Sequence, residues 1–209
     1  MIITEAKPII EVIESIGDAR KVLILGCGKC ATSCETGGIK QVKEMCELLE
    51  GKGFIVSSGV VDAQCDERLT FRELKKHEGY DCIVSMACGS GVAALADLTE
   101  KHVVPSNNTL FVGVIKPGRI YEERCSLCGE CMLAATGGIC PQTRCSKGLL
   151  HGPCGGSSNG YCEVDNTREC AWIIITKRLR KLGRTADLNR VNQPRKCMHA
   201  RKPRAVKKK

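Results

Sequence analysis

VLILGCGKCATSC, residues 22–34, joins a strand-like apolar run to a turn that can be interpreted in two ways. The glycines of GCGKCA, residues 26–31, match G-x-G-x-x-A, a turn that places the pyrophosphate of a dinucleotide at a helix N-terminus. The cysteines of the same stretch match C-x2-C-x3-C, a spacing suited to a metal ion or an iron–sulfur cluster. The rest of the chain has to distinguish these two interpretations.

Outward from this stretch, residues 1–118 alternate between apolar runs and amphipathic helical patterns. The expected helices are 9–16, 40–51, 67–79 and 92–102, and the expected strands are 22–25, 54–61, 82–87 and 110–118. Such alternation predicts an α/β fold with a mostly parallel, open sheet of the Rossmann or flavodoxin type.

Five cysteines follow the carboxyl ends of these expected strands. They are Cys27, Cys30 and Cys34 after the first strand, Cys65 after the second and Cys88 after the third. The carboxyl edge of an open α/β sheet is where ligands bind. We therefore expect four of the five to hold a [4Fe–4S] cluster, without knowing which one is left over. Cys46 and Cys82 fall inside a helix and a strand and are interpreted as packing residues.

Two other interpretations of the opening turn are weaker. A dinucleotide site needs an acidic residue about 20 residues further on, at the end of the second strand. Glu47 and Glu50 have that spacing but belong to a helix, and Asp62 is too distant in the sequence. Redox chemistry of a Cys27–Cys30 dithiol is also conceivable, but three more cysteines at the same edge favour ligation.

Beyond about Tyr121 the regular apolar periodicity disappears and cysteines become dense. A segment this short and polar cannot bury enough surface to fold alone, so it needs metal or cluster bonds. We expect an α/β domain at 1–122, a cysteine-rich metal or cluster domain at 123–176, and a basic helix with a disordered tail at 177–209.

Eight cysteines of this second domain could form two sites of four ligands. Cys125, Cys128 and Cys131 have the C-x2-C-x2-C spacing of ferredoxin clusters, and Cys140, followed by Pro141, is the expected fourth ligand. Cys140 comes later than in ferredoxins, so Cys145 and Cys170 compete for that place. The further site, a cluster or a zinc ion, is expected at Cys145, Cys154, Cys162 and Cys170.

The composition indicates the cellular compartment of the protein and the classes of partner that it can bind. The chain has 209 residues and 16 cysteines, with no leader-like N-terminal pattern and no apolar run long enough for a membrane span. Cysteines used as ligands indicate a reducing compartment, so we expect a cytoplasmic protein. The net charge is +9, but residues 177–209 are so basic that residues 1–176 carry −4. Nucleic-acid binding is therefore not expected.

No Ser/His/Asp set or pair of carboxylates suggests a general acid, a base or a nucleophile. His151 lies near Cys154 and is interpreted as a loop residue rather than a ligand. The apolar stretch Trp172–Ile175, with Leu179 and Leu182, either packs on its own domain or docks a partner subunit.

Residues 137–172, GGICPQTRCSKGLLHGPCGGSSNGYCEVDNTRECAW, resemble the C-terminal-domain signature of the methylenetetrahydrofolate reductase family. The stretches GCGKCATSCETGG, QCDE, MACGSGV and ERCSLCGECML also fit, so the resemblance spans residues 20–176. The chain is most similar to the stand-alone small iron–sulfur subunit of the bacterial enzyme, which is also described as zinc-containing.

The resemblance implies an electron-transfer subunit in one-carbon metabolism rather than a catalytic chain. Its partner would be a flavin-containing methylenetetrahydrofolate reductase subunit, with ferredoxin or a larger electron-transfer complex as the external donor. Two or more [4Fe–4S] clusters, with zinc as the alternative in the second domain, would be its cofactors. A zinc-stapled interaction or nucleic-acid-binding module and a Rossmann-type nucleotide-binding oxidoreductase stay open as alternatives.

Overall fold

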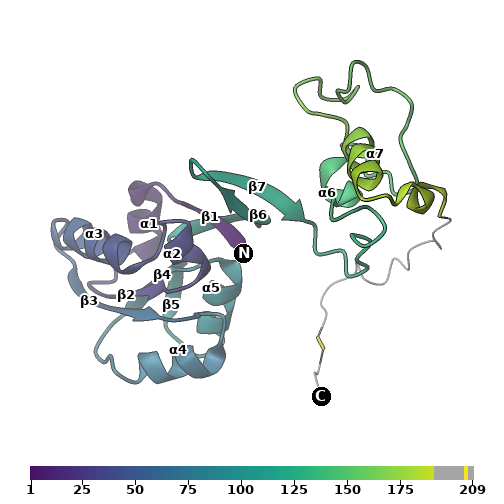
Figure 1. Cartoon of the computed structure of the whole chain (residues 1–209). Coiled ribbons are helices and arrows are strands. Elements are labelled where there is room, and N and C mark those ends of the chain that lie inside the picture. Colours follow the sequence, from purple (N-terminus) through teal and green to yellow (C-terminus); the bar gives the residue numbers. More distant parts are fainter. Residues whose placement is uncertain (191–204, 207–209) are drawn as a thin grey trace. The chain divides into compact units, whose positions relative to one another are not determined.

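The chain divides into two compact units, Met1–Val114 and Ile115–Lys209 (Figure 1). The computed structural model describes residues 1–190 and 205–206. The predicted disordered tail after Pro194 therefore lies outside the described residues, apart from residues 205 and 206.

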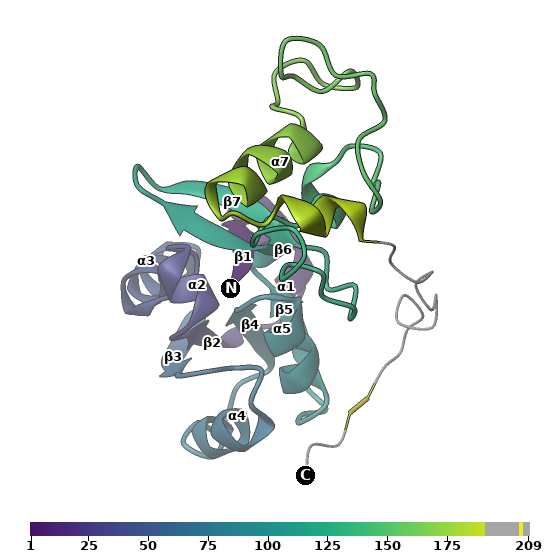
Figure 2. The ribbon, with the colours of Figure 1, turned by 45° about the vertical axis from the view of Figure 1, so that its right-hand side comes forward.

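A four-stranded parallel sheet forms the centre of the first unit (Figure 2). Its strands are, in spatial order, β3 (Ile55–Val61), β2 (Lys21–Cys27), β4 (Cys82–Met86) and β5 (His102–Pro105). β2 lies between β3 and β4, with Leu23 opposite Ser57 on one side and Ile83 on the other. This arrangement confirms the predicted α/β class with a mostly parallel sheet.

Helices cover both faces of this sheet. Val22 and Ile24 face α1 (Ile9–Ile16) and α3 (Ile39–Glu50), whose buried residues complete one apolar cluster. Leu23 and Leu25 belong to the opposite cluster, which Leu74 of α4 (Glu67–Leu74) and Leu95 of α5 (Gly89–Ala96) complete. A strand buried on both faces is apolar at successive positions, which explains the uninterrupted VLIL run.

The expected parallel strand at 110–118 proves to be antiparallel. β6 (Asn107–Lys116) pairs antiparallel with β1 (Ile2–Ala6), a strand that the sequence analysis did not anticipate. β7 (Ile120–Cys125) follows β6 and completes a second sheet in the order β1-β6-β7. The local apolar pattern identified β6 as a strand, but its direction depends on a partner more than 100 residues away.

Two expected helices have different bounds in the structure. The helix expected at 67–79 ends at Leu74, and the one expected at 92–102 is α5, which begins at Gly89 and ends at Ala96. His102 instead begins β5 and pairs with Cys82 of β4. Strand pairing at the sheet edge overrides the weak helical preference of the segment after Ala96.

The second unit is largely irregular around a small core. Its helices are α6 (Pro141–Arg144), α7 (Ala171–Lys181) and a 3-10 turn at Thr185–Asn189. Trp172, Ile175 and Leu179 of α7 are buried with Cys170, and the Trp172 indole N–H donates to the carbonyl of Leu149 at 3.0 Å. None of the described helices is long and apolar enough to cross a membrane.

Gly26 of the opening turn is needed for close packing and not for an unusual backbone angle. A Cβ at Gly26 would lie 2.5 Å from Val42 Cγ2 and 2.6 Å from the carbonyl oxygen of Gly37. That same carbonyl accepts the N–H of Cys27 at 2.8 Å. The glycine therefore lets the loop at Gly37 approach the end of β2 and hold Cys27 in place.

We expect Gly26→Ala to lower the free energy of unfolding by about 1–3 kcal/mol, because the added methyl group overpacks this contact. Chemical denaturation of the metal-free chain measures the loss. Gly89→Ala is the matched control, since a Cβ there meets nothing nearer than Thr109 Oγ1 at 3.4 Å. Equal stabilities of the two variants would contradict the packing argument.

Candidate functional site

The five candidate ligand cysteines of the first unit lie at the ends of strands or just beyond them, as predicted. Cys27 ends β2, Cys30 and Cys34 begin and cap α2 (Cys30–Ser33), and Cys88 precedes α5 as its N-cap residue. Cys65 lies in the loop between β3 and α4. Cys27, Cys34 and Cys88 are buried, whereas Cys65 is exposed.

Three of these thiols lie within electrostatic reach of Cys65. The pKa of the Cys65 thiol is raised, first by partial desolvation and then by the neighbouring thiols of Cys88 and Cys27, with a smaller effect of Cys30. A negative charge on Cys65 is thus destabilised by three other potential negative charges. Such crowding is relieved when a cationic centre binds the sulfurs.

Cys34 contacts the strand β1. Its sulfur lies 3.7 Å from the carbonyl oxygen of Ile2 in β1, and it is not among the thiols that raise the pKa of Cys65. Cys30 instead accepts the N–H of Ile2 at 3.5 Å. The strand β1 therefore contacts both cysteines, donating to one and accepting from the other. No local sequence signal pointed to this role of Ile2, since its partners are about 30 residues away.

In the second unit, Cys125 and Cys140 are linked through two hydroxyl groups. Thr143 Oγ1 donates to Cys140 Sγ at 3.2 Å and lies 3.3 Å from the hydroxyl of Ser126, the residue after Cys125. Cys140 therefore lies next to the loop that begins with Cys125. This contact supports the expected grouping of Cys140 with the C-x2-C-x2-C segment, which Cys128 and Cys131 complete.

Four further cysteines of this unit line one small cavity. Cys145, Cys154, Cys162 and Cys170 enclose a space of about 20 Å³, together with Trp172, Lys147 and Glu163. Cys145 and Cys170 flank α6 and α7, so two helix ends and the irregular loop converge here. A volume of this size holds about one water molecule.

Hydrogen-bond donors lie near several sulfurs of the second unit. Backbone N–H groups two residues later point to Cys125 at 3.4 Å and to Cys154 at 3.5 Å. The pKa of Cys162 is lowered, first by the N–H of Val164 and then by the Ser146 hydroxyl and the N–H of Asp165. Donors aimed at sulfur stabilise the charge that a metal ligand must carry.

The thiols lie in groups, but their sulfur atoms do not surround a common point. Within residues 1–190 and 205–206, no set of three or more His, Cys, Asp or Glu side chains is arranged so that it could hold one metal ion. Metal binding would therefore require the grouped side chains to rotate toward a shared centre.

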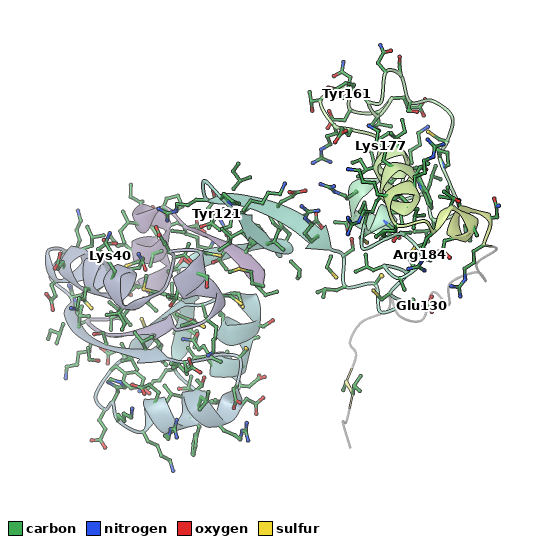
Figure 3. All side chains as sticks on the ribbon, viewed as in Figure 1. Lys40, Tyr121, Glu130, Tyr161, Lys177 and Arg184 are labelled. Atoms are coloured by element: carbon green, nitrogen blue, oxygen red, sulfur yellow. The ribbon has the colours of Figure 1, made fainter. Side chains whose placement is uncertain are left out.

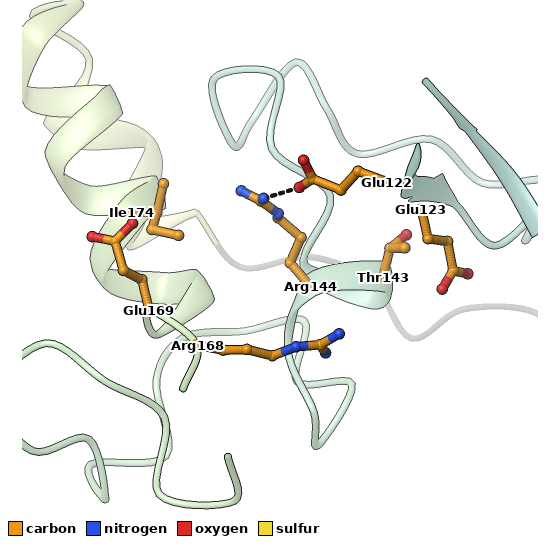
Figure 4. Close-up of a pocket in the computed structure, with 7 residues that line it drawn as sticks. All are labelled: Glu122, Glu123, Thr143, Arg144, Arg168, Glu169 and Ile174. Atoms are coloured by element: carbon orange, nitrogen blue, oxygen red, sulfur yellow. Dashed lines mark hydrogen bonds and ion pairs between the residues drawn. The ribbon is translucent and has the colours of Figure 1, made fainter. Parts of the chain in front are cut away.

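A larger cavity of about 340 Å³ in the second unit contains no thiol (Figure 4). It is lined by Glu122, Glu123, Thr143, Arg144, Arg168, Glu169 and Ile174. Glu122 binds Arg144 and also pairs with Lys116 and Arg124. The Glu122–Arg144 ion pair joins β7, which ends in Cys125, to α6, which lies between Cys140 and Cys145. We interpret this network as structural support for the cysteine segment.

Residues outside the proposed ligand sets have ordinary roles. Cys82 is buried in the main core and Cys46 packs against it, which confirms their interpretation as packing residues. Burial, with the nearby Asp81 charge, raises the pKa of Cys82 to about 11. His151 is not among the residues that line the 20 Å³ cavity and instead lines a second small cavity with Trp172 and Asp187.

The apolar face of α7 is occupied by its own unit. Trp172, Ile175 and Leu179 are at most 7% exposed, so the packing interpretation of this stretch is confirmed, and only Leu182 of the group is exposed. Basic residues extend along α7 and the turn after it: Lys177, Arg178, Arg180, Lys181 and Arg184. Figure 3 shows Lys177 on the helix and Arg184 beyond its end.

Comparison with known proteins gives one match. Residues 104–198 match the family model described as methylene-tetrahydrofolate reductase C terminal. No curated protein matches the chain. No solved structure matches it either. The match covers the cysteine-rich second unit, including both of its four-cysteine groups.

We expect iodoacetamide to alkylate Cys162 first, Cys65 more slowly and Cys82 last in the metal-free chain. Alkylation proceeds through the thiolate, the pKa of Cys162 is lowered, and those of Cys65 and Cys82 are raised. At neutral pH each unit of pKa changes the thiolate fraction about tenfold.

A time course of peptide mass spectrometry measures the three rates. The same reaction in denaturant is the control and should remove the order. Faster labelling of Cys65 than of Cys162 would show that the hydrogen bonds to Cys162 are not formed in solution.

Proposed function

We propose that this chain is an iron–sulfur electron-transfer subunit of a methylenetetrahydrofolate reductase complex. In this role it relays electrons between an external donor and the flavin of a separate catalytic subunit. The family match over residues 104–198 supports the enzyme system. The thiol groups of both units support the redox role.

The proposal rests chiefly on the convergence of Cys27, Cys30, Cys65 and Cys88 at one sheet edge. These residues come from three strand ends, and the thiols of the other three raise the pKa of Cys65. Four thiols are the ligand set of a [4Fe–4S] cluster. We therefore assign Cys34 as the member of the five that is not a ligand.

The surroundings of these thiols suit a buried anionic group. Cys88 caps the N-terminus of α5, where the helix dipole favours negative charge. The Ile2 N–H directed at Cys30 adds a donor. Cys27 packs against Ala31 and Ala87, which keep water from that side of the sulfur. When bound, a [4Fe–4S] cluster supplies reversible one-electron chemistry at such a site.

The second unit would hold two different centres. Cys125, Cys128, Cys131 and Cys140 are assigned to a second [4Fe–4S] cluster, on the C-x2-C-x2-C spacing and the Ser126–Thr143 link to Cys140. Cys145, Cys154, Cys162 and Cys170 are assigned to a zinc ion, because all four line one cavity and four thiolates are a common ligand set of structural zinc.

The proposed partner is the flavin-containing catalytic subunit, with ferredoxin or a larger electron-transfer complex as donor. The basic residues of α7 supply a charged surface to which an acidic partner could be drawn. We propose that the protein works in the cytoplasm, where ligand thiols stay reduced.

We expect Cys65→Ser to remove about half of the bound iron and sulfide, and Cys34→Ser to leave both unchanged. Serine is a poor ligand for iron, and of these two residues only Cys65 is a ligand in our assignment. Iron and sulfide analysis of anaerobically purified protein measures the difference. Cys27→Ser should behave like Cys65→Ser. Loss of iron in Cys34→Ser, with retention in Cys65→Ser, would reverse the assignment.

We expect Cys154→Ser to reduce bound zinc while iron is retained, and Cys125→Ser to do the opposite. The two residues lie in the same unit but in different ligand groups, so each serves as the control for the other. Metal analysis by mass spectrometry gives both contents for each variant. Loss of iron in Cys154→Ser would indicate a cluster in the small cavity.

The absorption spectrum tests the proposal as a whole. Clusters should give a broad band near ~400 nm that bleaches on reduction. Zinc without iron or visible absorption would exclude the electron-transfer role and favour a zinc-stapled interaction module.

A further inference from the structure

A buried amide lies among the strand ends that carry the first group of thiols. Gln64 is 0% exposed, although it belongs to the loop between β3 and α4. The next residue is Cys65, which is exposed. A fully buried glutamine in a loop is unusual, because burying an amide is costly unless all its hydrogen bonds are formed.

The Gln64 side chain bonds to the two central strands at once. Its Nε2 donates to the carbonyl of Leu25 at 3.1 Å and lies 3.5 Å from that of Gly26, both directly before Cys27 in β2. Its Oε1 accepts the hydroxyl of Ser85 in β4, three residues before Cys88. One side chain therefore joins the strand that ends in Cys27 to the strand that leads to Cys88.

Two further contacts hold the same residue in place. The Thr70 hydroxyl of α4 donates to the Gln64 carbonyl at 2.8 Å. On the other side, a Cβ at Gly91 of α5 would lie 3.2 Å from the Gln64 Cβ, so the helix after Cys88 packs directly on Gln64. The loop segment next to Cys65 is thus held by β2, β4, α4 and α5.

We propose that Gln64 is a positioning residue, which holds the Cys65 thiol within reach of the Cys27 and Cys88 thiols. Cys65 is the one member of the group in an exposed loop, so its place depends on what anchors that loop. This inference rests on the proposed function in taking these thiols as the ligand group. The positioning effect itself concerns how near the Cys65 thiol lies to the Cys27 and Cys88 thiols, which can be tested in the metal-free chain.

The test is cross-linking of the full metal-free chain with a short bifunctional thiol reagent, mapped by mass spectrometry. Gln64→Met keeps the length and burial of the side chain and removes its hydrogen bonds. Ser85→Ala removes one of those bonds and serves as a milder variant in case Gln64→Met folds poorly. Val12→Ala is the control, since Val12 is buried in the core formed with α1 and lies outside the Gln64 hydrogen bonds.

We expect Gln64→Met to reduce the yield of Cys65–Cys27 and Cys65–Cys88 cross-links about tenfold, because lost hydrogen bonds release the loop. Ser85→Ala should reduce it less, and Val12→Ala should leave it unchanged although the fold is destabilised. Iron content after reconstitution should fall in the same order.

Wild-type cross-linking in Gln64→Met, or equal losses in Gln64→Met and Val12→Ala, would overturn the positioning role. A wild-type chain that binds no iron would instead contradict the proposed function and leave the cross-linking comparison intact. The two failures are therefore distinguishable.

Discussion

The parallel pairing of β2 with β3 and β4 is the constraint on which the first unit depends. In a parallel sheet, every strand ends at the same edge, so residues far apart in the chain come together there without any local contact. Helices on both faces bury β4 and all of β2 except Lys21, which prevents a change of register. The thiols after β2, β3 and β4 are neighbours because of this topology.

The same edge must also be packed tightly enough to hold those thiols still. Gly26 lets the Gly37 carbonyl reach the N–H of Cys27, and the Gln64 amide bonds to both central strands. These contacts are made by backbone and neutral polar groups. They therefore position the sulfurs without adding charge to a site where thiolates already repel one another.

The second unit holds its thiols in a different way. It has no sheet core, and its apolar centre is the group of Cys170, Trp172, Ile175 and Leu179 with a few neighbours. So small a core contributes little stability, and metal–thiolate bonds would supply much of the remainder. Donors to Cys162 lower the pKa of its thiol. At Cys65, by contrast, desolvation and crowding disfavour charge until a cation is present.

Local patterns in the sequence determined the strands β2, β3, β4 and β6, the central parts of the helices α1, α3, α4 and α5, the α/β class and the positions of cysteines at the strand ends. Those properties follow from periodicity and chain order, which are short-range. The tertiary structure decided that β6 runs antiparallel to β1, that Cys30 and Cys34 both contact Ile2 of β1, and that Gln64 is buried between two strands. Each of these depends on which segments meet in space, and pairing between distant segments leaves no periodic signal in either one.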